Sequence, residues 1–451
     1  MPTIATPSTV AVDRPTHLSN RVVWGLIVFG LPIFFFVLPD GIDGDGRYRF
    51  AALQGLLSGT GIPATKYPLI GSLPAVPLLL LGRLVASPEW WVSRYNVAVY
   101  AAGIGLLYAL LRRRLAGDVL AAFLLLLGTT AMLPNSLTGF GAETFTAMAA
   151  GTGLAAWSMG RWKTATVLLG VGVANQPATL IGLILALGWW AWREKQLRAM
   201  APIVLAASLW LLENGVRRGS ALVTGYEQDH GFRTLLPYSG LTGFSYPLFF
   251  GVPSLLISSG KGLLFFAPGL VLAFKRGLEV VRPIRDVMVL WLLYLAGLVF
   301  VYGGWWAWYG GFTWGPRFLM FASLPASLLL AAQVRRPPSA LLPSTVVLAV
   351  LVLSVWVGID GQTFGRYGQG VCAANDYRLE SFCWYLPEFS VLWTPFVGHP
   401  DFSWLYPIVI AYAAVVAAYV AWPLLRHWTV TLRRDLGSIW AGYRRRAAWR
   451  F

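Results

Sequence analysis

LLPSTVVLAVLVLSVWVG, residues 341–358, contains no charged side chain. The run follows the basic pair Arg335-Arg336 and leads into a polar segment at 358–404. A helix crosses the hydrocarbon core of a bilayer with about 20 mostly apolar residues. This stretch therefore predicts a transmembrane helix that has basic residues at one end and a polar loop at the other.

The whole chain repeats this pattern. Of its 451 residues, 57% are hydrophobic and 12% are charged, and the mean hydropathy is +0.62. A soluble domain has about 25% charged residues, so the composition excludes a soluble protein as well as a disordered chain, a collagen or a coiled coil. Candidate spans begin near Arg21, Tyr95, Val119, Thr144, Thr164, Pro177, Met200, Phe249, Val287, Phe318, Leu341 and Tyr406. We expect an all-α polytopic membrane protein with about 12 transmembrane helices (10–13 at the limits), whose first apolar helix is retained and whose outer loops carry short helices.

The net charge of +16 reflects the orientation of the chain in the membrane. Short cytoplasmic loops are enriched in Lys and Arg, whereas a nucleic-acid-binding protein gathers its basic residues on one face or in one domain. The basic groups lie between apolar stretches at 112–114, 161–163, 193–198, 275–285 and 335–336, and in the tail at 426–450. With both chain ends inside, all of these groups are cytoplasmic. Residues 1–425 then form one transmembrane domain and residues 426–451 a basic cytoplasmic tail.

The same topology places four polar segments outside, at 40–68, 214–245, 302–317 and 358–404. The segment LIGSLPAVPLLLLGRLV at 69–85 is apolar but contains three helix breakers in its first half, Gly71, Pro74 and Pro77. We interpret it as re-entrant or interfacial, because a crossing there would place residues 112–114 outside.

The two cysteines of the chain, Cys372 and Cys383, lie in the last outer segment. In an oxidising compartment a disulfide is the leading interpretation, and two buried free thiols are the alternative.

The chain has few carboxylates, and the outer segments hold most of those that are not in cytoplasmic loops. Asp43 and Asp45 alternate with glycines just after the first apolar helix, with Asp40 before them. A carboxylate at a membrane boundary is costly unless it is paired or hydrated. The aspartates therefore form either a hydrated turn, in which Asp45 caps the next helix, or a general base or metal ligand. Glu143, at the mouth of an apolar helix, either reaches the interface or faces a polar cavity, and we favour the cavity.

Two glycine-rich outer segments carry cations. Lys261 lies between two glycines, but the spacing around it excludes a P-loop. The remaining interpretation is that Lys261 is a cation suited to binding the phosphate of a lipid. Residues 302–321 combine aromatics and glycines with Arg317. An interfacial aromatic belt explains some of the aromatic residues. The alternative is a binding site in which the aromatic side chains stack on a sugar and Arg317 contacts a phosphate. This alternative also explains the glycines and the arginine. Lys66, in the first outer segment, is a third candidate cation.

Together these motifs resemble the GT-C superfamily of polytopic glycosyltransferases, in particular bacterial relatives of the protein mannosyltransferases and of the lipid A aminoarabinose transferase. The resemblance rests on Asp43-Gly-Asp45-Gly-Arg47-Tyr48, on Lys66-Tyr67-Pro68-Leu69, on the run from Asn214 through Tyr226 to Ser259-Gly-Lys261-Gly262 and Pro268, and on Gly304-Trp305-Trp306 with Trp314-Gly315-Pro316-Arg317-Phe318. It implies an extracytoplasmic active site in a bacterial inner membrane. It also implies transfer of a sugar, with inversion, from a polyprenyl-phosphate donor to an envelope glycan, lipid or protein.

The resemblance also implies roles for individual residues. The general base would be Asp45 or Asp43; we prefer Asp45, although the family's acid lies three residues before the arginine, where this chain has Gly44. Some relatives bind a divalent metal, for which Asp43, Asp45 and Glu143 are the candidates here; no cofactor is otherwise implied. The candidate substrate-binding residues are Arg47, Lys66, Glu143, Tyr226, Lys261, Trp305, Trp306 and Arg317.

Two other classes of protein remain. A secondary transporter or lipid-linked sugar flippase would show repeated halves with broken helices at matching positions, and the chain has no convincing internal repeat. A polytopic polysaccharide ligase would lack the first-loop aspartate base.

Overall fold

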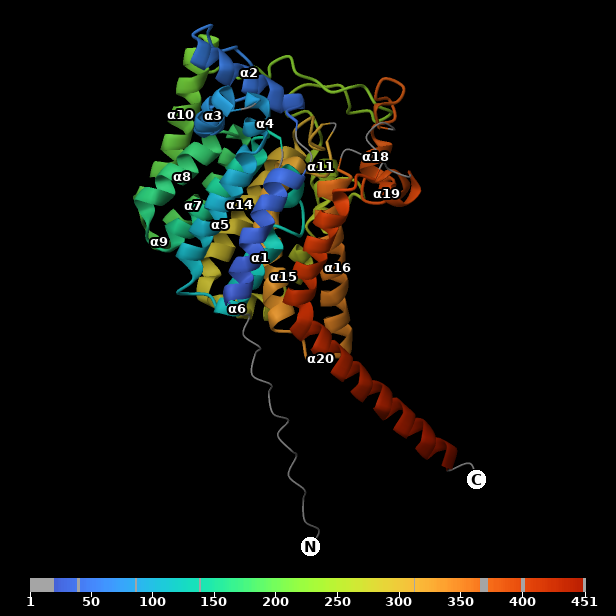
Figure 1. The fold of residues 1–451 in the computed structure, drawn as a ribbon. Helices are drawn as coiled ribbons and strands as arrows, with labels where there is room; N and C mark the ends of the chain where they lie inside the picture. Colours follow the sequence, from blue (N-terminus) through green and yellow to red (C-terminus); the bar gives the residue numbers. More distant parts are fainter. Residues whose placement is uncertain are drawn as a thin grey trace.

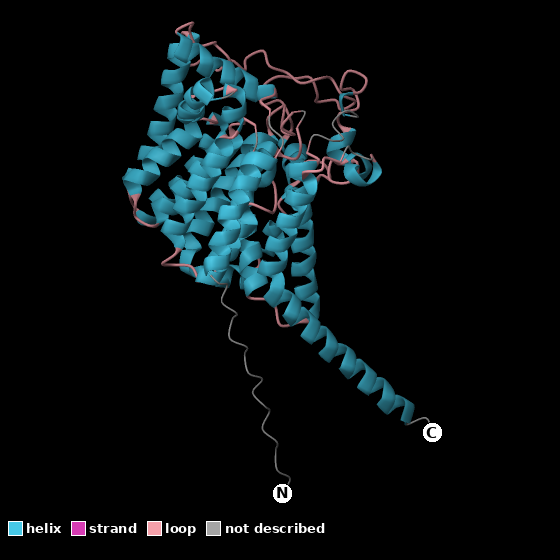
Figure 2. Cartoon of the chain, in the orientation of Figure 1, coloured by secondary structure: helices cyan, strands magenta, loops and turns pink. Residues whose placement is uncertain are grey.

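The structure is a computed structural model that describes residues 20–38, 41–85, 87–137, 139–311, 313–365, 372–398 and 402–448. Within these ranges every regular element is a helix, apart from one isolated antiparallel bridge between His230 and Thr242 (Figure 2). The prediction of an all-α protein is confirmed. Asp40 and residues 449–451 of the basic tail lie outside the described residues.

The α-helices follow one another along the whole chain. In order they are α1 (Asn20–Pro32), α2 (Gly44–Ser58), α3 (Val76–Val85), α4 (Pro88–Ser93), α5 (Tyr95–Leu111), α6 (Gly117–Leu127), α7 (Glu143–Ser158), α8 (Trp162–Ala174), α9 (Leu180–Glu194), α10 (Ala201–Arg218), α11 (Leu248–Ile257), α12 (Leu263–Phe266), α13 (Lys275–Val280), α14 (Arg285–Gly303), α15 (Ser323–Arg335), α16 (Leu341–Thr363), α18 (Phe382–Tyr385), α19 (Thr394–Val397) and α20 (Tyr406–Ala448). Short 3-10 helices extend several of them, including Ile70–Ala75 before α3 and Arg317–Ala322 before α15.

A helix begins within three residues of each of the twelve predicted span starts. Six continuous helical segments in the described residues are long and apolar enough to cross a bilayer: Pro88–Leu111, Leu197–Arg218, Arg282–Gly303, Arg317–Arg335, Leu341–Thr363 and Tyr406–Ala441. Five shorter apolar helices accompany them, at Arg21–Val37, Ile70–Val85, Gly117–Leu127, Trp162–Ala174 and Leu248–Ile257. The chain is a polytopic membrane protein, and the number of its crossings stays a prediction.

The core of the bundle forms around α15, in which all residues from Ser323 to Arg335 are buried. Small residues let neighbouring helices approach closely. A Cβ at Gly297 of α14 would overlap the backbone of Gly182 in α9, and one at Gly251 of α11 would overlap Gly303 of α14. These glycine contacts allow α14 to pack closely against both α9 and α11.

The predicted outer segments gather at one end of the bundle. Figure 1 shows α2, α3, α4, α18 and α19 at this end, while α20 runs out past the opposite end. Most of the long loops also lie at this end (Figure 2). The segment 69–85 folds there as a 3-10 helix followed by α3, which packs against α4. Its re-entrant or interfacial placement stays a prediction.

Candidate functional site

Arg317 lies between two carboxylates that come from distant parts of the chain. Its Nη1 donates to Oδ2 of Asp45 at 2.8 Å and lies 3.6 Å from Oε1 of Glu143. Asp45 is in the first turn of α2, and Glu143 is the first residue of α7. The side chains of Arg317 and Asp45 are 23% and 25% exposed. A ligand can therefore reach the ion pair without unfolding of its surroundings.

The two aspartates of the first outer segment face different surroundings. Asp45 pairs with Arg317, whereas Asp43 lines an open hollow together with Arg47 and Tyr48. Asp43 is the N-cap of α2 and has an extended backbone, whereas Asp45 lies in the first turn of the helix, which explains the separation. The structure thus distinguishes two carboxylates that the sequence pattern left as alternatives.

The surroundings of Asp45 keep it ionised. Burial alone would raise the pKa of Asp45, but Arg317 opposes this, with further contributions from Tyr67 and Arg49, and the pKa falls below its ordinary value of 3.8. At neutral pH the carboxylate is charged and is therefore able to accept a proton.

Tyr67 is a part of the site to which the sequence gave no role. Its hydroxyl donates a hydrogen bond to Asp45. Its ring stacks on Tyr48 at 5.4 Å between centroids, and the guanidinium of Arg49 lies 5.1 Å from the ring centre. Burial, with the charge of Asp45 added, raises the pKa of Tyr67, so the hydroxyl keeps its proton and orients the carboxylate.

The end of α10 holds the loop that carries Lys66 and Tyr67. Arg217 donates to the carbonyl oxygens of Pro63 and Tyr67 at 2.7 and 2.8 Å. It is paired with Glu213 at 2.5 Å, and Glu213 also accepts from the backbone N–H of Leu69 at 2.7 Å. A signal for this role was present in the sequence, because a basic pair at 217–218 is unusual at the outer end of a membrane helix.

Lys66 joins the first outer segment to the loop that follows α10. Its Nζ pairs with Oδ1 of Asp229 at 2.6 Å and lies 5.4 Å from the ring centre of Tyr226. Tyr226 in turn contacts Trp305 edge-on, with 5.7 Å between ring centroids. Burial raises the pKa of Tyr226 to about 12, and Arg49, Asp45 and Arg317 all influence it. Tyr226 therefore lies near the Asp45–Arg317 pair, and Lys66 and Trp305 lie against Tyr226.

Trp306 and Arg47 have mainly backbone partners. The amide of Trp306 donates to the carbonyl of Gly243 at 3.0 Å, and its ring packs on Gly231. Nε of Arg47 donates to the carbonyl of Ile42 at 2.9 Å. Trp306 thus connects the 302–317 segment to the loop after α10, and Arg47 borders the hollow next to Asp43.

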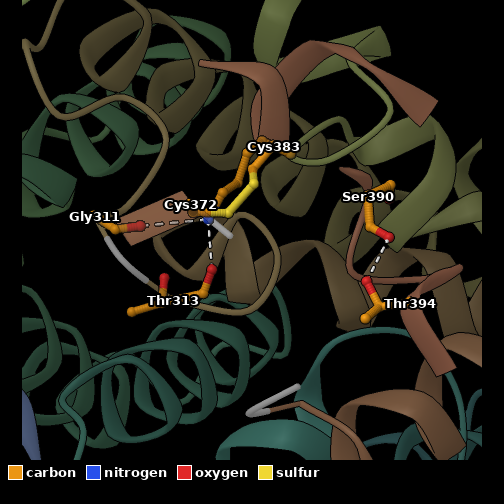
Figure 3. Close-up of a disulfide and its surroundings, with 7 residues drawn as sticks. Gly311, Thr313, Cys372, Cys383, Ser390 and Thr394 are labelled. Atoms are coloured by element: carbon orange, nitrogen blue, oxygen red, sulfur yellow. Dashed lines mark hydrogen bonds between the residues drawn. A yellow bond between two sulfur atoms is a disulfide. The ribbon is translucent and has the colours of Figure 1, made fainter. Parts of the chain in front are cut away.

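Lys261 is buried and does not pair with the Asp45 cluster. Its Nζ donates to the carbonyl oxygens of Gly311, Thr313 and Gly315 at 3.4, 2.6 and 3.1 Å. Figure 3 labels Gly311 and Thr313 and draws dashed hydrogen bonds at their oxygens. Cys372 and Cys383 form a disulfide in the same region, with 6.0 Å between their Cα atoms (Figure 3).

The described residues contain no group of three or more His, Cys, Asp or Glu side chains arranged to hold a metal ion. Of the three candidate metal ligands, Asp45 and Glu143 approach Arg317, whereas Asp43 faces the hollow. The structure therefore does not assemble the three carboxylates into one site.

Comparison with known proteins shows the fold. No family model matches the chain, and no curated protein matches it. Among solved structures, ArnT from Cupriavidus metallidurans bound to undecaprenyl phosphate superposes with a TM-score of 0.51 at 15% identity, over 92% of this chain and 78% of that chain. The apo state of the same protein superposes with a TM-score of 0.51 at 16% identity and the same coverage. The predicted resemblance is thus confirmed for the fold alone, because this chain shares the fold of that protein.

Proposed function

We propose that this chain is a membrane glycosyltransferase that moves a sugar from a polyprenyl-phosphate donor to an acceptor hydroxyl, with Asp45 as the general base. The observation that carries the proposal is the ion pair of Asp45 and Arg317, with Glu143 beside it, at the end of the bundle where the long loops gather. An ionised carboxylate next to a cation offers both functions that the reaction requires: a base for the acceptor hydroxyl and a positive charge for the leaving phosphate. The fold shared with a protein crystallised with undecaprenyl phosphate supports the class of donor.

In this reaction Asp45 removes the proton of the acceptor hydroxyl as its oxygen attacks the anomeric carbon. The bond between that carbon and the donor phosphate breaks, and the phosphate leaves with the electron pair. Negative charge grows on the leaving phosphate, and a cation held beside it stabilises the transition state. Arg317 is the candidate for that contact because its side chain is partly exposed and its guanidinium has further N–H donors beyond the one that Asp45 accepts.

We assign the base to Asp45 rather than Asp43. Arg317 and Tyr67 hold the carboxylate of Asp45 in one orientation, and a general base must lie within hydrogen-bond reach of the proton that it takes. Glu143 lies beside the same arginine and would orient the acceptor or the guanidinium. Asp43, in the hollow with Arg47, would contact the acceptor outside the reacting centre.

The remaining candidates surround this pair. Lys66 offers a second cation to the donor phosphate, because its ion pair with Asp229 is partly exposed. Tyr226, Trp305 and Trp306 present rings on which a sugar face can stack, since sugar C–H groups favour aromatic surfaces. We place the site on the extracytoplasmic side of a bacterial inner membrane, because the basic groups of the sequence then lie in the cytoplasm.

A donor screen tests the proposal. The purified chain, in lipid nanodiscs, is incubated with several polyprenyl-phosphate sugars and with envelope lipids, glycans and peptides as acceptors. Release of polyprenyl phosphate together with a glycosylated acceptor, both lost in Asp45→Asn, is the expected result. Movement of labelled donor between the leaflets of proteoliposomes, without transfer to any acceptor, would contradict the proposal and favour a flippase.

A further inference from the structure

The segment that delivers Arg317 to Asp45 is a glycine-rich loop between α14 and α15. Gly310, Gly311 and Gly315 have φ angles of +83°, +72° and +62°, a region that other residues rarely adopt. Such a loop loses much conformational entropy when it is ordered. Something outside the loop must therefore hold it if the guanidinium of Arg317 is to keep a fixed position.

Lys261 is placed to do this from the loop between α11 and α12. Its side chain is buried, at 5% exposure, and its Nζ is bonded to three carbonyl oxygens of the glycine-rich loop, those of Gly311, Thr313 and Gly315. An ammonium group has three N–H donors, so these three acceptors occupy all of them. A phosphate ligand would have to break these bonds to reach Nζ.

The same loop is held at a second point by α16. Nε1 of Trp314 donates to Oδ2 of Asp360 at 2.8 Å, and both side chains are buried. Trp314 lies three residues before Arg317 and between two of the carbonyl groups bonded to Lys261. Lys261 thus holds the backbone of the loop, and Asp360 holds the side chain of Trp314.

The last outer segment fixes the position of Lys261 in turn. The amide of Gly260 donates to the carbonyl of Trp384 at 3.1 Å, and Oγ of Ser390 donates to the carbonyl of Ser259 at 2.8 Å. A Cβ at Gly260 would overlap the backbone of Cys383. Glu380 is buried in the same segment, and its carboxylate attracts the Lys261 charge.

We propose that Lys261 is a positioning residue: by binding the carbonyl groups of residues 311–315 it holds Arg317 against Asp45, and it does not contact the substrate. The expected effect of Lys261 on turnover rests on the proposed function. The ordering of the loop by Lys261 does not depend on that function. This positioning role differs from the phosphate-binding role that the sequence pattern suggested for Lys261. Removal of the amine leaves the carbonyl groups of Thr313 and Gly315 without the donor that they have in the structure, while the carbonyl of Gly311 keeps the amide of Thr313. The loss of these bonds is costly, and the loop then loosens.

Hydrogen exchange tests the ordering without any substrate. Lys261→Met keeps most of the side-chain length and removes the donors, Lys261→Arg keeps both donors and charge, and Lys163→Met, at an exposed lysine of α8, is the matched control. In Lys261→Met we expect peptides over 310–317 to lose protection while peptides over α7 keep theirs. Lys261→Arg should recover part of the protection, and the control should behave as the wild type. Unchanged protection over 310–317 in Lys261→Met would overturn the proposal.

Kinetics tests the coupling to Arg317. We expect Lys261→Met to lower kcat about tenfold or more, equivalent to about 1.4 kcal/mol, while the KM for the donor stays within about twofold. The acid-side loss of activity should move to higher pH, as in Arg317→Gln, because the guanidinium no longer lowers the pKa of Asp45. The double variant should fall little below Arg317→Gln alone. A raised donor KM with unchanged kcat would instead identify Lys261 as a phosphate ligand and refute the positioning role.

A second variant covers the case in which Lys261→Met fails to fold. Trp314→Phe keeps the ring and removes the hydrogen bond to Asp360, so it should also loosen 310–317 and lower kcat with little change in donor KM. If neither the exchange protection of 310–317 nor kcat changes in Trp314→Phe, the loop is not held as proposed. A wild-type protein that transfers no sugar would refute the proposed function by itself, and the exchange experiment would still decide whether Lys261 orders the loop.

Discussion

Lys66 and Lys261 both lie in glycine-rich stretches that the sequence singled out, yet their surroundings are opposite. Lys66 is 26% exposed and is paired with a carboxylate that is 25% exposed, and its Nζ lies above the rings of Tyr67 and Tyr226. Lys261 is buried and bonded to backbone carbonyl groups. A partly exposed ion pair can exchange its carboxylate for a phosphate at small cost, because such pairs contribute little free energy. A buried cation fixed by three carbonyl groups serves the loop that it binds.

The same contrast separates the two ends of the site. On the α2 side, charged side chains meet each other: Asp45 with Arg317 and Lys66 with Asp229. On the α11 side, side chains meet backbone, and a disulfide closes the segment that covers them. We infer that the first side reacts and the second side maintains its geometry. Substitutions on the two sides should therefore differ in kind, with direct chemical effects on one and indirect effects on the other.

The largest effect is expected on the reacting side, from Asp45→Asn. A general base contributes about 10²–10⁴-fold to the rate, so we expect kcat to fall about 10³-fold. The substitution keeps the size of the side chain and its ability to accept hydrogen bonds. Steady-state transfer assays measure the loss, and thermal unfolding checks that the protein folds.

Asp43→Asn is the matched control for that variant. It lies two residues away, on the hollow side of α2, and should leave kcat within a few-fold of the wild type. A 10³-fold loss in Asp43→Asn, with an active Asp45→Asn, would exchange the roles of the two aspartates. Full activity in both variants would eliminate a first-loop base.

The second largest effect is expected for Arg317→Gln. Removal of one donor that stabilises developing negative charge costs about 10²–10³-fold in kcat, and we expect a loss of about 10²-fold. Arg47→Gln, in the hollow, is the control and should change turnover only slightly. Equal effects of the two substitutions would mean that the position of Arg317 beside Asp45 has no special importance.

Lys66→Ala should have a smaller effect, and mainly on binding. Loss of a charge-assisted contact to the donor phosphate costs about 1.5–3 kcal/mol, so we expect the donor KM to rise about tenfold or more, with a smaller change in kcat. This is the reverse of the pattern expected for Lys261→Met. If the two lysine variants show the same split between kcat and KM, the contrast between the two regions is wrong.

The smallest effect on turnover is expected from loss of the disulfide. Closure of a loop as short as 372–383 stabilises the native state by about 2–3 kcal/mol. In the double variant Cys372→Ser/Cys383→Ser we therefore expect a lower Tm, while kcat falls only a few-fold because Lys261 keeps its carbonyl partners. A loss as large as that of Asp45→Asn would place this segment in the reacting centre.

The fold class and the starts of the helices could be predicted because they depend on local composition. An apolar run such as 341–358 must be helical in a bilayer, whatever its neighbours are, since no water satisfies its backbone. The sequence also singled out Asp45, Glu143 and Arg317 one by one. Their meeting could not be predicted, because Arg317 and Asp45 are 272 residues apart and only the packing of α2, α7 and the 3-10 helix before α15 brings them together.

The remainder of the site was beyond the sequence for the same reason. Tyr67 is one of 18 tyrosines, and only the fold places its hydroxyl on Asp45. The pattern around Lys261 was read as a phosphate site because glycines flank it, whereas these glycines allow close packing against Cys383 and within its own loop. A glycine beside a lysine does not distinguish an approaching ligand from an approaching backbone. Tertiary structure decides between them.

The acid side of the pH–rate profile tests the central claim, that Asp45 is the base and that Arg317 keeps it ionised. The pKa of Asp45 lies below 3.8, so wild-type kcat/KM should stay level down to about pH 5. Without the guanidinium, burial is left to raise the pKa, and in Arg317→Gln the residual activity should fall at distinctly higher pH than in the wild type. Wild-type and variant profiles that lose activity at the same pH would contradict the account.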